Sequence, residues 1–555
     1  MLAFPASASA AGLETIIQDD RLFLHQPKES VAQSMADVRA LGADTVRLTA
    51  NWSSLAPAAD QKTKPPGIDL SDPASYETAR WQRLDDAVRL ATAQGLRVAI
   101  DIGFWAPLWA TADEKGPRAK TAVNPQDYAE FTVALVRRYS GTFAPPPPVG
   151  PAPPPSEDEQ ELDRVLGSVP PPPGVTRAPQ ERASEEPAPS PLPKVSHFTL
   201  WNEPNHHALL MPQWTPDGKT ASPAIYRAMV MAAYPAAKGV RPDTKILIGN
   251  TSSSGGATAG GSGPVAPLRF LRDVACVDEN LRPRSDGDCA GFTTLPGDGW
   301  AHHPYARNMP PDATNRGRRS DDVLVGDLPR MALTLDALAA SGRIGEAVRE
   351  IHVTEFGYET EALGPDRPGV PQDRHAQWIV WGERMAGKVP TVKAWAQFLL
   401  RDQPPAAERV SESLRRPFGQ FWTGLYGSEG QEKLAVQSFK AGLVAERAGR
   451  KGVTLWGRLR LGDGARRLFI ERSVLGRPWR RLTTNTPQGG RLEGSFLADG
   501  RESFARGARY VRGARYRLVV SGMPAGLPVD VVGKAPKAKA KKRSAAKRRA
   551  AKRRS

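Results

Sequence analysis

The sequence predicts an α/β fold, a (β/α)8 TIM barrel followed by a C-terminal all-β sandwich domain. Two patterns carry this prediction. Over residues 13–448, short apolar runs alternate with segments of helical spacing, which is typical of a barrel of parallel strands. Over residues 452–530 the helical spacing is lost, and apolar and polar residues alternate with a period of two. The length of 555 residues is sufficient for both domains.

Eight short, mainly apolar segments are expected to form the strands of the barrel. Each ends at a turn or leads into a helical segment, as the crossover connections of a parallel sheet require. The expected strands lie at or near residues 13–17, 43–52, 96–103, 197–205, 245–250, 299–305, 350–358 and 392–400.

Eight helical segments are expected to alternate with these strands. Gly42 and Gly95 directly follow the first two, at the position where glycine commonly ends a helix. The expected helices cover residues 27–41, 74–94, 124–140, 222–238, 265–275, 327–341, 371–388 and 431–446.

A proline-rich segment interrupts the barrel before its fourth strand. Prolines make up 17 of the 49 residues from 145 to 193. Such a density opposes the interiors of helices and sheets and favours extended, solvated chain. Because the alternation of strands and helices resumes afterwards, we expect residues 145–193 to be a disordered insertion within the barrel domain and not a linker between two domains.

The net charge of +17 is concentrated at the C-terminus. Residues 534–555 contain 12 lysines and arginines and no acid, which leaves +5 for residues 1–533. The basic segment 531–555 has too few apolar residues to fold alone and is expected to be a disordered tail. Such tails bind polyanions without sequence specificity. We expect contact with anionic cell-envelope polymers and no specific nucleic-acid partner; nucleic-acid binding through the tail is the rival interpretation.

Two features favour an exported protein. The Ala/Ser-rich residues 1–12 contain small-x-small patterns, and we interpret them as a signal-peptide remnant. Cys276 and Cys289 are 13 residues apart in a loop rich in Gly, Asp and Pro, which suits a disulfide; two unpaired buried thiols are the alternative. No apolar run reaches the roughly 18 residues of a membrane span. We therefore expect a secreted or extracellular protein that associates with the cell envelope through its tail.

Two glutamates lie at the carboxyl ends of expected strands. In His-Phe-Thr-Leu-Trp-Asn-Glu-Pro-Asn, residues 197–205, Pro204 ends the strand pairing directly after Glu203. In Glu-Ile-His-Val-Thr-Glu-Phe-Gly-Tyr, residues 350–358, a turn follows Glu355 in the same way. The carboxyl ends of parallel strands form the active face of a barrel. A lone glutamate before a turn is usually a solvated cap, but a pair suits glycoside hydrolysis, which needs two carboxyl groups.

These motifs resemble those of a known clan of enzymes. Leu-Trp-Asn-Glu-Pro-Asn at 200–205 and Val-Thr-Glu-Phe-Gly at 353–357 are similar to the fourth-strand and seventh-strand motifs of the clan A glycoside hydrolases, with families 5 and 39 nearest. The resemblance covers residues 13–448 and implies a (β/α)8 barrel that hydrolyses O-glycosidic, by expectation β-linked, bonds in oligo- or polysaccharides. It implies a retaining mechanism with Glu355 as the nucleophile and Glu203 as the acid/base.

The two roles require different protonation states. An ionised Glu355 attacks the anomeric carbon, while a protonated Glu203 donates to the leaving oxygen and later takes a proton from water. Since two nearby negative charges repel each other, we expect the ionised Glu355 to raise the pKa of Glu203. A retaining mechanism also requires the two carboxyl groups to lie about 5 to 5.5 Å apart.

Five further residues are candidates for binding the carbohydrate. Arg47 and Asn202 match the clan's arginine beside the nucleophile and its asparagine that binds the sugar 2-hydroxyl; a surface arginine is the alternative for Arg47. Tyr305 is expected to donate a hydrogen bond to the nucleophile, with a core tyrosine as the alternative. His303 is expected to hydrogen-bond the substrate or a catalytic group. Trp395 on the eighth strand is a candidate sugar platform, because sugar rings present apolar faces to an indole.

The remaining tryptophans and histidines receive simpler interpretations. Trp52, Trp105 and Trp109 could line further sugar subsites, but core packing is the favoured interpretation for each. The pairs at 206–207 and 302–303 lack the i, i+4 spacing and the acidic third ligand of a metal site. We therefore expect no metal ion and no cofactor.

The sequence leaves one alternative function open, a catalytically inactive carbohydrate-binding barrel protein of the cell surface. Such a protein keeps the barrel and its aromatic groove but lacks a complete catalytic pair. Both Glu203 and Glu355 are present, which favours the enzyme.

Overall fold

The computed structural model describes residues 12–147, 190–256, 263–315, 317, 321–361, 368–404, 421–482, 484–485, 491–492 and 494–533. Three expected segments lie mostly outside the described residues: the signal-peptide remnant, the proline-rich insertion and the basic tail. No helix in the described ranges is long and apolar enough to cross a membrane.

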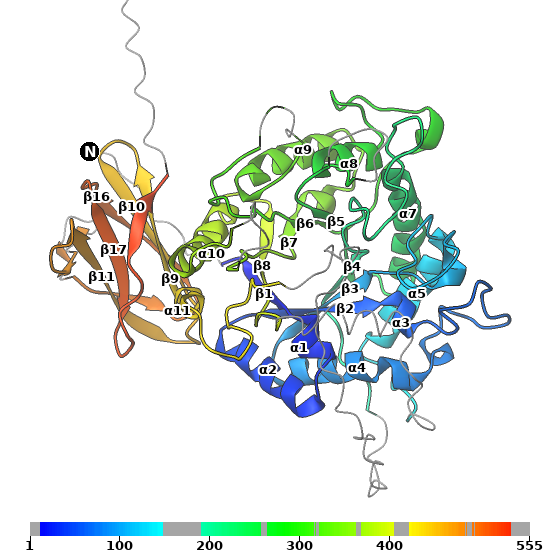
Figure 1. Cartoon of the computed structure of the whole chain (residues 1–555), viewed down its shortest axis with the longest axis horizontal. Coiled ribbons are helices and arrows are strands. Elements are labelled where there is room, and N and C mark those ends of the chain that lie inside the picture. The colour runs from blue at the N-terminus through cyan, green and yellow to red at the C-terminus, as the bar shows by residue number, and fades with distance from the viewer. Residues whose placement is uncertain are drawn as a thin grey trace, which may run out of the picture.

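Eight parallel strands close into a barrel in which neighbours in sequence are neighbours in the sheet (Figure 1). The last strand pairs with the first, so the barrel has no open edge. This confirms the predicted (β/α)8 architecture. The strands are β1 (Glu14–Gln18), β2 (Thr45–Asn51), β3 (Arg97–Gly103), β4 (His197–Leu200), β5 (Lys245–Ser252), β6 (Trp300–His303), β7 (Ile351–Val353) and β8 (Val392–Phe398).

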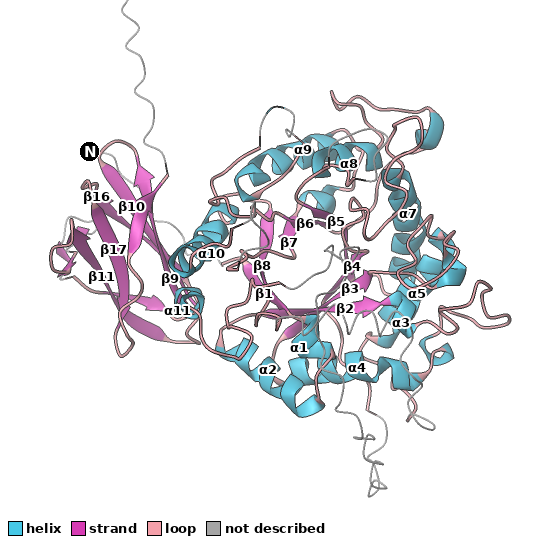
Figure 2. Cartoon of the chain, viewed as in Figure 1, coloured by secondary structure: helices cyan, strands magenta, loops and turns pink. Residues whose placement is uncertain are grey.

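Helices surround the barrel on its outside (Figure 2). Local sequence explains where several begin; the side chain of Asn124, for example, accepts hydrogen bonds from the first turn of α5, which starts at Pro125. The helices are α1 (Asp20–Leu24), α2 (Lys28–Ala40), α3 (Trp52–Leu55), α4 (Thr78–Ala93), α5 (Pro125–Arg138), α7 (Ser222–Val240), α8 (Pro267–Val274), α9 (Leu328–Ala340), α10 (Gln372–Ala386) and α11 (Leu434–Lys440).

The main apolar core lies between the strands and the surrounding helices. A separate small cluster of Ile16, Ala394 and Ala396 lies on the paired strands β1 and β8. Successive side chains of a strand point to opposite faces. On β8, residues 394, 396 and 398 therefore face the barrel interior, and residues 395 and 397 face the helices.

The last four residues of the expected insertion, 190–193, are described by the structure and do not match the expected disorder. Leu192 is buried, and its N–H donates to the Phe143 carbonyl over 2.8 Å. Arg89 Nη2 donates to the carbonyl oxygen of Ser190 over 2.6 Å. Residues 190–193 therefore pack on the barrel, because an apolar leucine lies between the last two prolines of the segment.

The C-terminal domain is an all-β unit with its own apolar core. Its sheet order is β12, β11, β17, β18, β9, β10 and β16, with β15 beside β11, and all pairs are antiparallel except β18 with β9. The strands are β9 (Ala441–Ala448), β10 (Gly452–Leu459), β11 (Ala465–Val474), β12 (Arg480–Arg481), β13 (Thr484–Asn485), β14 (Arg491–Leu492), β15 (Phe496–Asp499), β16 (Ser503–Arg509), β17 (Ala514–Val520) and β18 (Val529–Val532).

The expected helix 431–446 is wrong beyond Lys440. Residues 441–448 form β9, which pairs with β10 along its whole length. The sequence Ala-Gly-Leu-Val-Ala-Glu-Arg-Ala has ordinary helix propensity, but strand pairing and the burial of Leu443 and Val444 override it. The C-terminal sheet therefore begins at residue 441, before the boundary expected from the sequence.

The β9–β10 side of this domain packs on α10 through a buried ion pair. Arg460 Nη2 lies 2.7 Å from Glu383 Oε1, and both side chains are almost fully buried. Arg384 reaches the domain twice: its guanidinium lies over the Trp456 ring, 5.3 Å from the centroid, and its Nε lies 3.2 Å from Glu446 Oε2. These contacts join the C-terminal domain to α10 of the barrel.

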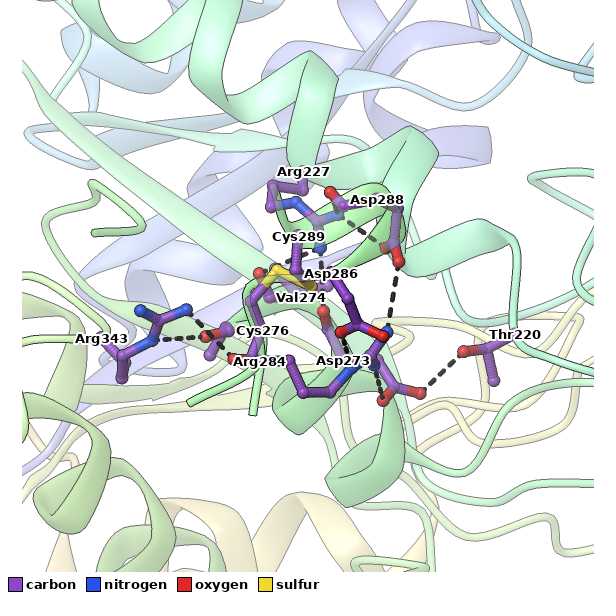
Figure 3. The surroundings of a disulfide bond; sticks show 11 residues. Thr220, Arg227, Asp273, Val274, Cys276, Arg284, Asp286, Asp288, Cys289 and Arg343 are labelled. Atoms are coloured by element: carbon purple, nitrogen blue, oxygen red, sulfur yellow. Dashed lines mark hydrogen bonds and ion pairs between the residues drawn. A yellow bond between two sulfur atoms is a disulfide. The ribbon is translucent and has the colours of Figure 1, made fainter. Parts of the chain in front are cut away.

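The predicted disulfide between Cys276 and Cys289 is confirmed, with the Cα atoms 5.6 Å apart (Figure 3). Two arginines bond to the chain next to this disulfide. Arg343 donates to the Cys276 carbonyl over 3.0 Å, and Arg227 Nη2 lies 2.7 Å from Asp288 Oδ2. The cross-link therefore fixes a loop that is also held by charge-assisted hydrogen bonds.

Candidate active site

Glu203 and Glu355 converge at the carboxyl ends of β4 and β7, three strands apart around the barrel. One carboxylate oxygen of each, together with Nδ1 of His303, forms a group in which all atoms lie within 4.8 Å of one another. Glu355 is 8% exposed, and the side chain of Glu203 is 19% exposed. The two carboxyl groups that the sequence places at separate strand ends therefore meet in one partly solvated site.

Two side chains, Arg47 and Tyr305, donate hydrogen bonds to the Glu355 carboxylate. Arg47 Nη1 donates to Oε1 over 2.7 Å, and Tyr305 donates its hydroxyl hydrogen to Oε2 over 3.1 Å. Burial lowers the pKa of Arg47, but the charges of Asp101 and Glu355 outweigh it and raise that pKa. Burial and the neighbouring carboxylates raise the pKa of Tyr305. Both groups therefore keep their protons and present them to the carboxylate.

Glu203 has a different partner. Its Oε1 lies 2.9 Å from His303 Nδ1, and His303 Nε2 lies 2.9 Å from Asn250 Oδ1. Since an amide oxygen can only accept, His303 donates from Nε2 to Asn250. His303 Nδ1 is also 3.6 Å from Glu355 Oε2, so the imidazole lies between the two carboxyl groups.

The expected upward shift of the Glu203 pKa is wrong. Burial raises the pKa of the Glu203 carboxyl. The hydrogen bond and charge of His303, with smaller contributions from His206 and His302, lower it by more than burial raises it, so the net shift of the pKa is downward. Repulsion from Glu355 is therefore not the dominant influence, because the fold places His303 against Glu203.

Asn202 is oriented by its side-chain oxygen. Asn202 Oδ1 accepts from Arg47 Nη2 and from Asn250 Nδ2, each over 3.2 Å. Because the oxygen is occupied, the Nδ2 group is the part of the amide that can donate to a ligand. Asn202 lies beside Glu203, as the expected contact with a sugar hydroxyl requires.

Three polar residues that support the site were not among the predicted candidates: Gln18, Asp101 and Asn250. Gln18 accepts a hydrogen bond from Arg47 Nη1. Asp101 Oδ1 lies 3.1 Å from Arg47 Nη2 and accepts from Asn250 Nδ2 over 2.9 Å. Each is a polar residue in or at the end of an otherwise apolar strand, which is the sequence signal that could have found them. Together they fix the guanidinium and the amides that carry the predicted site residues.

Trp395 is not a sugar platform. It is 3% exposed, and its ring lies 4.5 Å from that of Phe356, between β8 and α10. The prediction chose the wrong face of β8. Phe398, three residues on, lies on the interior face; its ring meets those of Tyr305 and Phe421 edge-on at 6.3 and 5.3 Å. Phe398 is therefore the aromatic residue of β8 that borders the site.

The other aromatic interpretations agree with the structure. Trp52 and Trp105 are fully buried, and Trp109 is nearly so. Trp52 stacks on Phe131 with ring centroids 5.5 Å apart. These tryptophans belong to the core, as favoured from the sequence.

The Glu203, His303 and Glu355 side chains are also the group that could hold a metal ion among the described residues. Their donor atoms are already engaged, because Nδ1 of His303 is bonded to Glu203 and both oxygens of Glu355 accept from protein donors. The Arg47 guanidinium supplies the positive charge beside Glu355. The hydrogen bonds from Arg47 and Tyr305 hold both Glu355 oxygens in this arrangement.

No protein-family model and no curated protein matches the chain. Among solved structures it is similar to a family 39 β-xylosidase from Caulobacter crescentus, with 15% identity, 85% of this chain and 84% of that chain covered, and a TM-score of 0.45. A glucosidase from Croceicoccus marinus shows 12% identity, 92% and 95% coverage, and a TM-score of 0.47. An exo-β-1,4-mannosidase from Opitutaceae bacterium strain TAV5 shows 13% identity, with 78% of this chain and 61% of that chain covered, and a TM-score of 0.40. At these values the geometry of the site, and not the similarity, supports the function proposed below.

Proposed function

We propose that the protein is a retaining glycoside hydrolase that cleaves O-glycosidic, β-linked bonds in oligo- or polysaccharides by double displacement. The distance between the carboxyl groups carries this proposal. Carboxylate oxygens of Glu203 and Glu355 lie within 4.8 Å of each other. Retaining enzymes hold their two carboxyl groups about 5 to 5.5 Å apart, whereas inverting enzymes need about 6.5 to 9.5 Å to admit a water molecule.

Glu355 is the proposed nucleophile. Its two donors, Arg47 and Tyr305, stabilise the carboxylate form and aim its oxygens into the site. The carboxylate attacks the anomeric carbon as the bond to the leaving oxygen breaks, and a glycosyl ester forms on Glu355. Water then attacks the same carbon and releases the carboxylate, so the sugar leaves with its original configuration.

Glu203 is the proposed acid/base, and His303 contacts its carboxyl group over 2.9 Å. The hydrogen bond and charge of His303 lower the pKa of Glu203. A bound sugar excludes water, and desolvation favours the neutral carboxylic acid. The proton then lies on Glu203, from which it passes to the leaving oxygen; in the second step Glu203 takes a proton from the attacking water.

The confirmed disulfide also supports the proposal that the protein is exported. Cys276 and Cys289 form a cross-link of a kind that persists in oxidising compartments and is rare in reducing ones. Expression with and without a secretory route, followed by thiol labelling, tests this: labelled cysteines in the functional protein would contradict export.

Substitution of the two glutamates tests the catalytic proposal. With a panel of aryl β-glycosides, Glu355→Ala is expected to abolish hydrolysis. Glu203→Ala is expected to retain a burst with good leaving groups, which need no proton, and to give a β-glycosyl azide when azide is added. Glu350→Ala, at the opposite end of β7 and half-exposed, is the control and should retain native activity.

The outcomes separate the enzyme from its alternative. Binding of oligosaccharides without turnover of any aryl β-glycoside would favour the catalytically inactive carbohydrate-binding barrel. Equal activity of Glu355→Ala and the native protein would contradict the assignment of the nucleophile.

A further inference from the structure

Charge is divided sharply between the two domains. The C-terminal domain, residues 441–533, contains 17 arginines, one lysine and seven acids, a net charge of +11. Residues 1–440 have a net charge of −6. The basic character of this protein is therefore not limited to its tail: a folded domain carries nearly as much positive charge.

Part of this charge lies on one face of the C-terminal sheet, formed by β11, β12 and β17. Strand pairing places Phe469 opposite Val519, and Glu471 opposite both Arg517 and Arg481. Paired residues share a face of the sheet. We call this surface the arginine face and define it by six residues: Arg467, Phe469, Trp479, Arg481, Arg515 and Arg517.

Two of its arginines are seated on aromatic rings. The Arg481 guanidinium carbon lies 3.9 Å from the centroid of Phe469, and that of Arg517 lies 4.5 Å from the centroid of Trp479. A guanidinium stacked on a ring loses side-chain freedom but keeps its N–H edges available for carboxylate or phosphate oxygens. These arginines are therefore oriented before any ligand binds.

The face has more positive charge than its acids neutralise. Glu471 pairs with Arg517 at 2.7 Å, and Asp530 with Arg515 at 3.2 Å. Arg467 and Arg481 are exposed, and within the described residues no carboxylate lies in ion-pair distance of either. The face consequently attracts anions and has free guanidinium groups to bind them.

The arginine face lies on the side of the domain away from the barrel. β9 packs on α10 and α11, while β11 and β17 lie on the far side of the domain (Figure 1). The buried pair of Arg460 and Glu383 is located at the barrel side. The arginine face is thus accessible to a polymer while the domain stays docked.

We propose that the arginine face binds an acidic polysaccharide and holds it while the barrel acts on the glycan. This inference rests on the proposed hydrolase function, because that function makes a glycan the polymer the protein meets. Single-stranded nucleic acid is disfavoured, since its bases need open aromatic faces for stacking and both rings here are covered by guanidinium groups.

The test uses the full-length protein and one polymer in two charge states. Polygalacturonate carries a carboxylate on each sugar, and its full methyl ester has the same backbone without charge. The native protein should bind polygalacturonate at low salt and should bind the ester at least tenfold more weakly. Comparable binding of both polymers would overturn the inference.

Three variants that each remove three positive charges locate the binding site. The face variant is Arg467→Gln, Arg481→Gln and Arg515→Gln. The tail variant is Lys541→Gln, Lys542→Gln and Arg543→Gln. The barrel variant is Lys219→Gln, Arg282→Gln and Arg349→Gln, whose side chains are exposed.

The face variant should lose affinity for polygalacturonate by about tenfold or more and show a shallower salt dependence. The tail and barrel variants should stay within about twofold of the native protein, since they keep the arginine face. A face variant within twofold of native, or an equal loss in the tail variant, would overturn the inference. The inference would also be overturned if single-stranded DNA of the same total charge bound the native protein as tightly as polygalacturonate and lost as much affinity in the face variant.

Hydrolysis of a small aryl β-glycoside is measured on every variant. It should be native in all three, because none of the changed residues lies at the active site. Absence of hydrolysis in the native protein would refute the proposed hydrolase, whereas native hydrolysis with unchanged polymer binding would refute only the arginine face.

Discussion

At the scale of single residues, Arg47 is the group on which the site depends. It is 1% exposed and contacts Gln18, Asp101, Asn202 and Glu355 through its two terminal nitrogens. A planar guanidinium can serve several acceptors in fixed directions, whereas an ammonium is a single point charge. The orientation of the nucleophile and of Asn202 therefore depends on the shape of Arg47 as well as on its charge.

Arg47→Lys should lower kcat/KM on an aryl β-glycoside by about 100-fold or more, since removal of a preorganised donor in an active site typically costs about 10²- to 10³-fold. The lysine keeps the charge but reaches fewer of the four partners. Arg97→Lys is the matched control, because Arg97 pairs with Glu14 at the opposite end of the strands and is half-exposed. Native-like kcat/KM in Arg47→Lys would contradict the positioning role.

At this scale the sequence predicted much of the site. The Asn-Glu-Pro motif located Glu203 from local sequence alone, although β4 ends at Leu200, before the position that Pro204 predicts. Trp395 was misplaced because the face of a strand residue depends on register, which no short motif encodes. The lowered pKa of Glu203 was missed because His303 comes from β6, and only the closed barrel brings it to β4.

At the scale of elements, α10 carries a buried histidine that makes stability depend on pH. His375 is fully buried, and neither ring nitrogen has a hydrogen-bond partner among the described residues. Burial, and secondarily the charge of Lys433, lowers the pKa of His375 to about 3. Between about pH 6.5 and pH 3 the unfolded chain binds a proton at this residue and the native protein does not. Stability therefore falls as the pH falls through this range.

His375→Phe and His375→Gln should both flatten this pH dependence. A group that titrates only in the unfolded state removes about 1.4 kcal/mol of stability per pH unit below its unfolded pKa, or about 2 kcal/mol between pH 6.5 and pH 5. Denaturant unfolding at pH 7 and pH 5 measures the difference. The two variants differ in baseline stability, so only the change in unfolding free energy between pH 7 and pH 5 is compared. If this change equals that of the native protein in both variants, His375 is protonated in the folded protein.

Element boundaries were the least predictable part of the fold. The eight strands and their order followed from hydrophobic periodicity, because strands buried on both faces leave a strong pattern. Residues 441–448 were misassigned because their strand state depends on pairing with β10, not on local propensity. Leu192 shows the same effect: a single leucine in a proline-rich run is ordered by what it packs against.

At the scale of the whole molecule, a buried cluster of Glu383 with Arg460 and Arg458 joins the two domains; Arg458 Nε lies 3.7 Å from Glu383 Oε1. Arg460 and Glu383 are both nearly inaccessible, and Arg460 also donates to Thr15 Oγ1 in β1. Removing Glu383 leaves both arginine charges buried without their carboxylate, and an uncompensated buried charge typically costs about 3 to 5 kcal/mol. Removing all three charged groups leaves no charge from this cluster.

Glu383→Gln should therefore destabilise the protein by about 3 to 5 kcal/mol. The triple variant Glu383→Gln, Arg458→Met, Arg460→Met should recover much of that loss, because it removes both buried arginine charges as well. Denaturant unfolding followed by both tryptophan fluorescence and far-UV circular dichroism measures the effect and detects separate unfolding of the domains. A triple variant no more stable than Glu383→Gln would contradict the charge argument and indicate lost packing instead.

The central claim is that Glu203 and Glu355 catalyse a double displacement, and the configuration of the first product tests it most directly. Proton NMR during hydrolysis of an aryl β-glycoside shows which anomer forms before mutarotation. Carboxylate oxygens within 4.8 Å predict that the β-anomer is released first. If the α-anomer appears first, water attacks directly, Glu355 is not a covalent nucleophile, and the proposed mechanism is wrong.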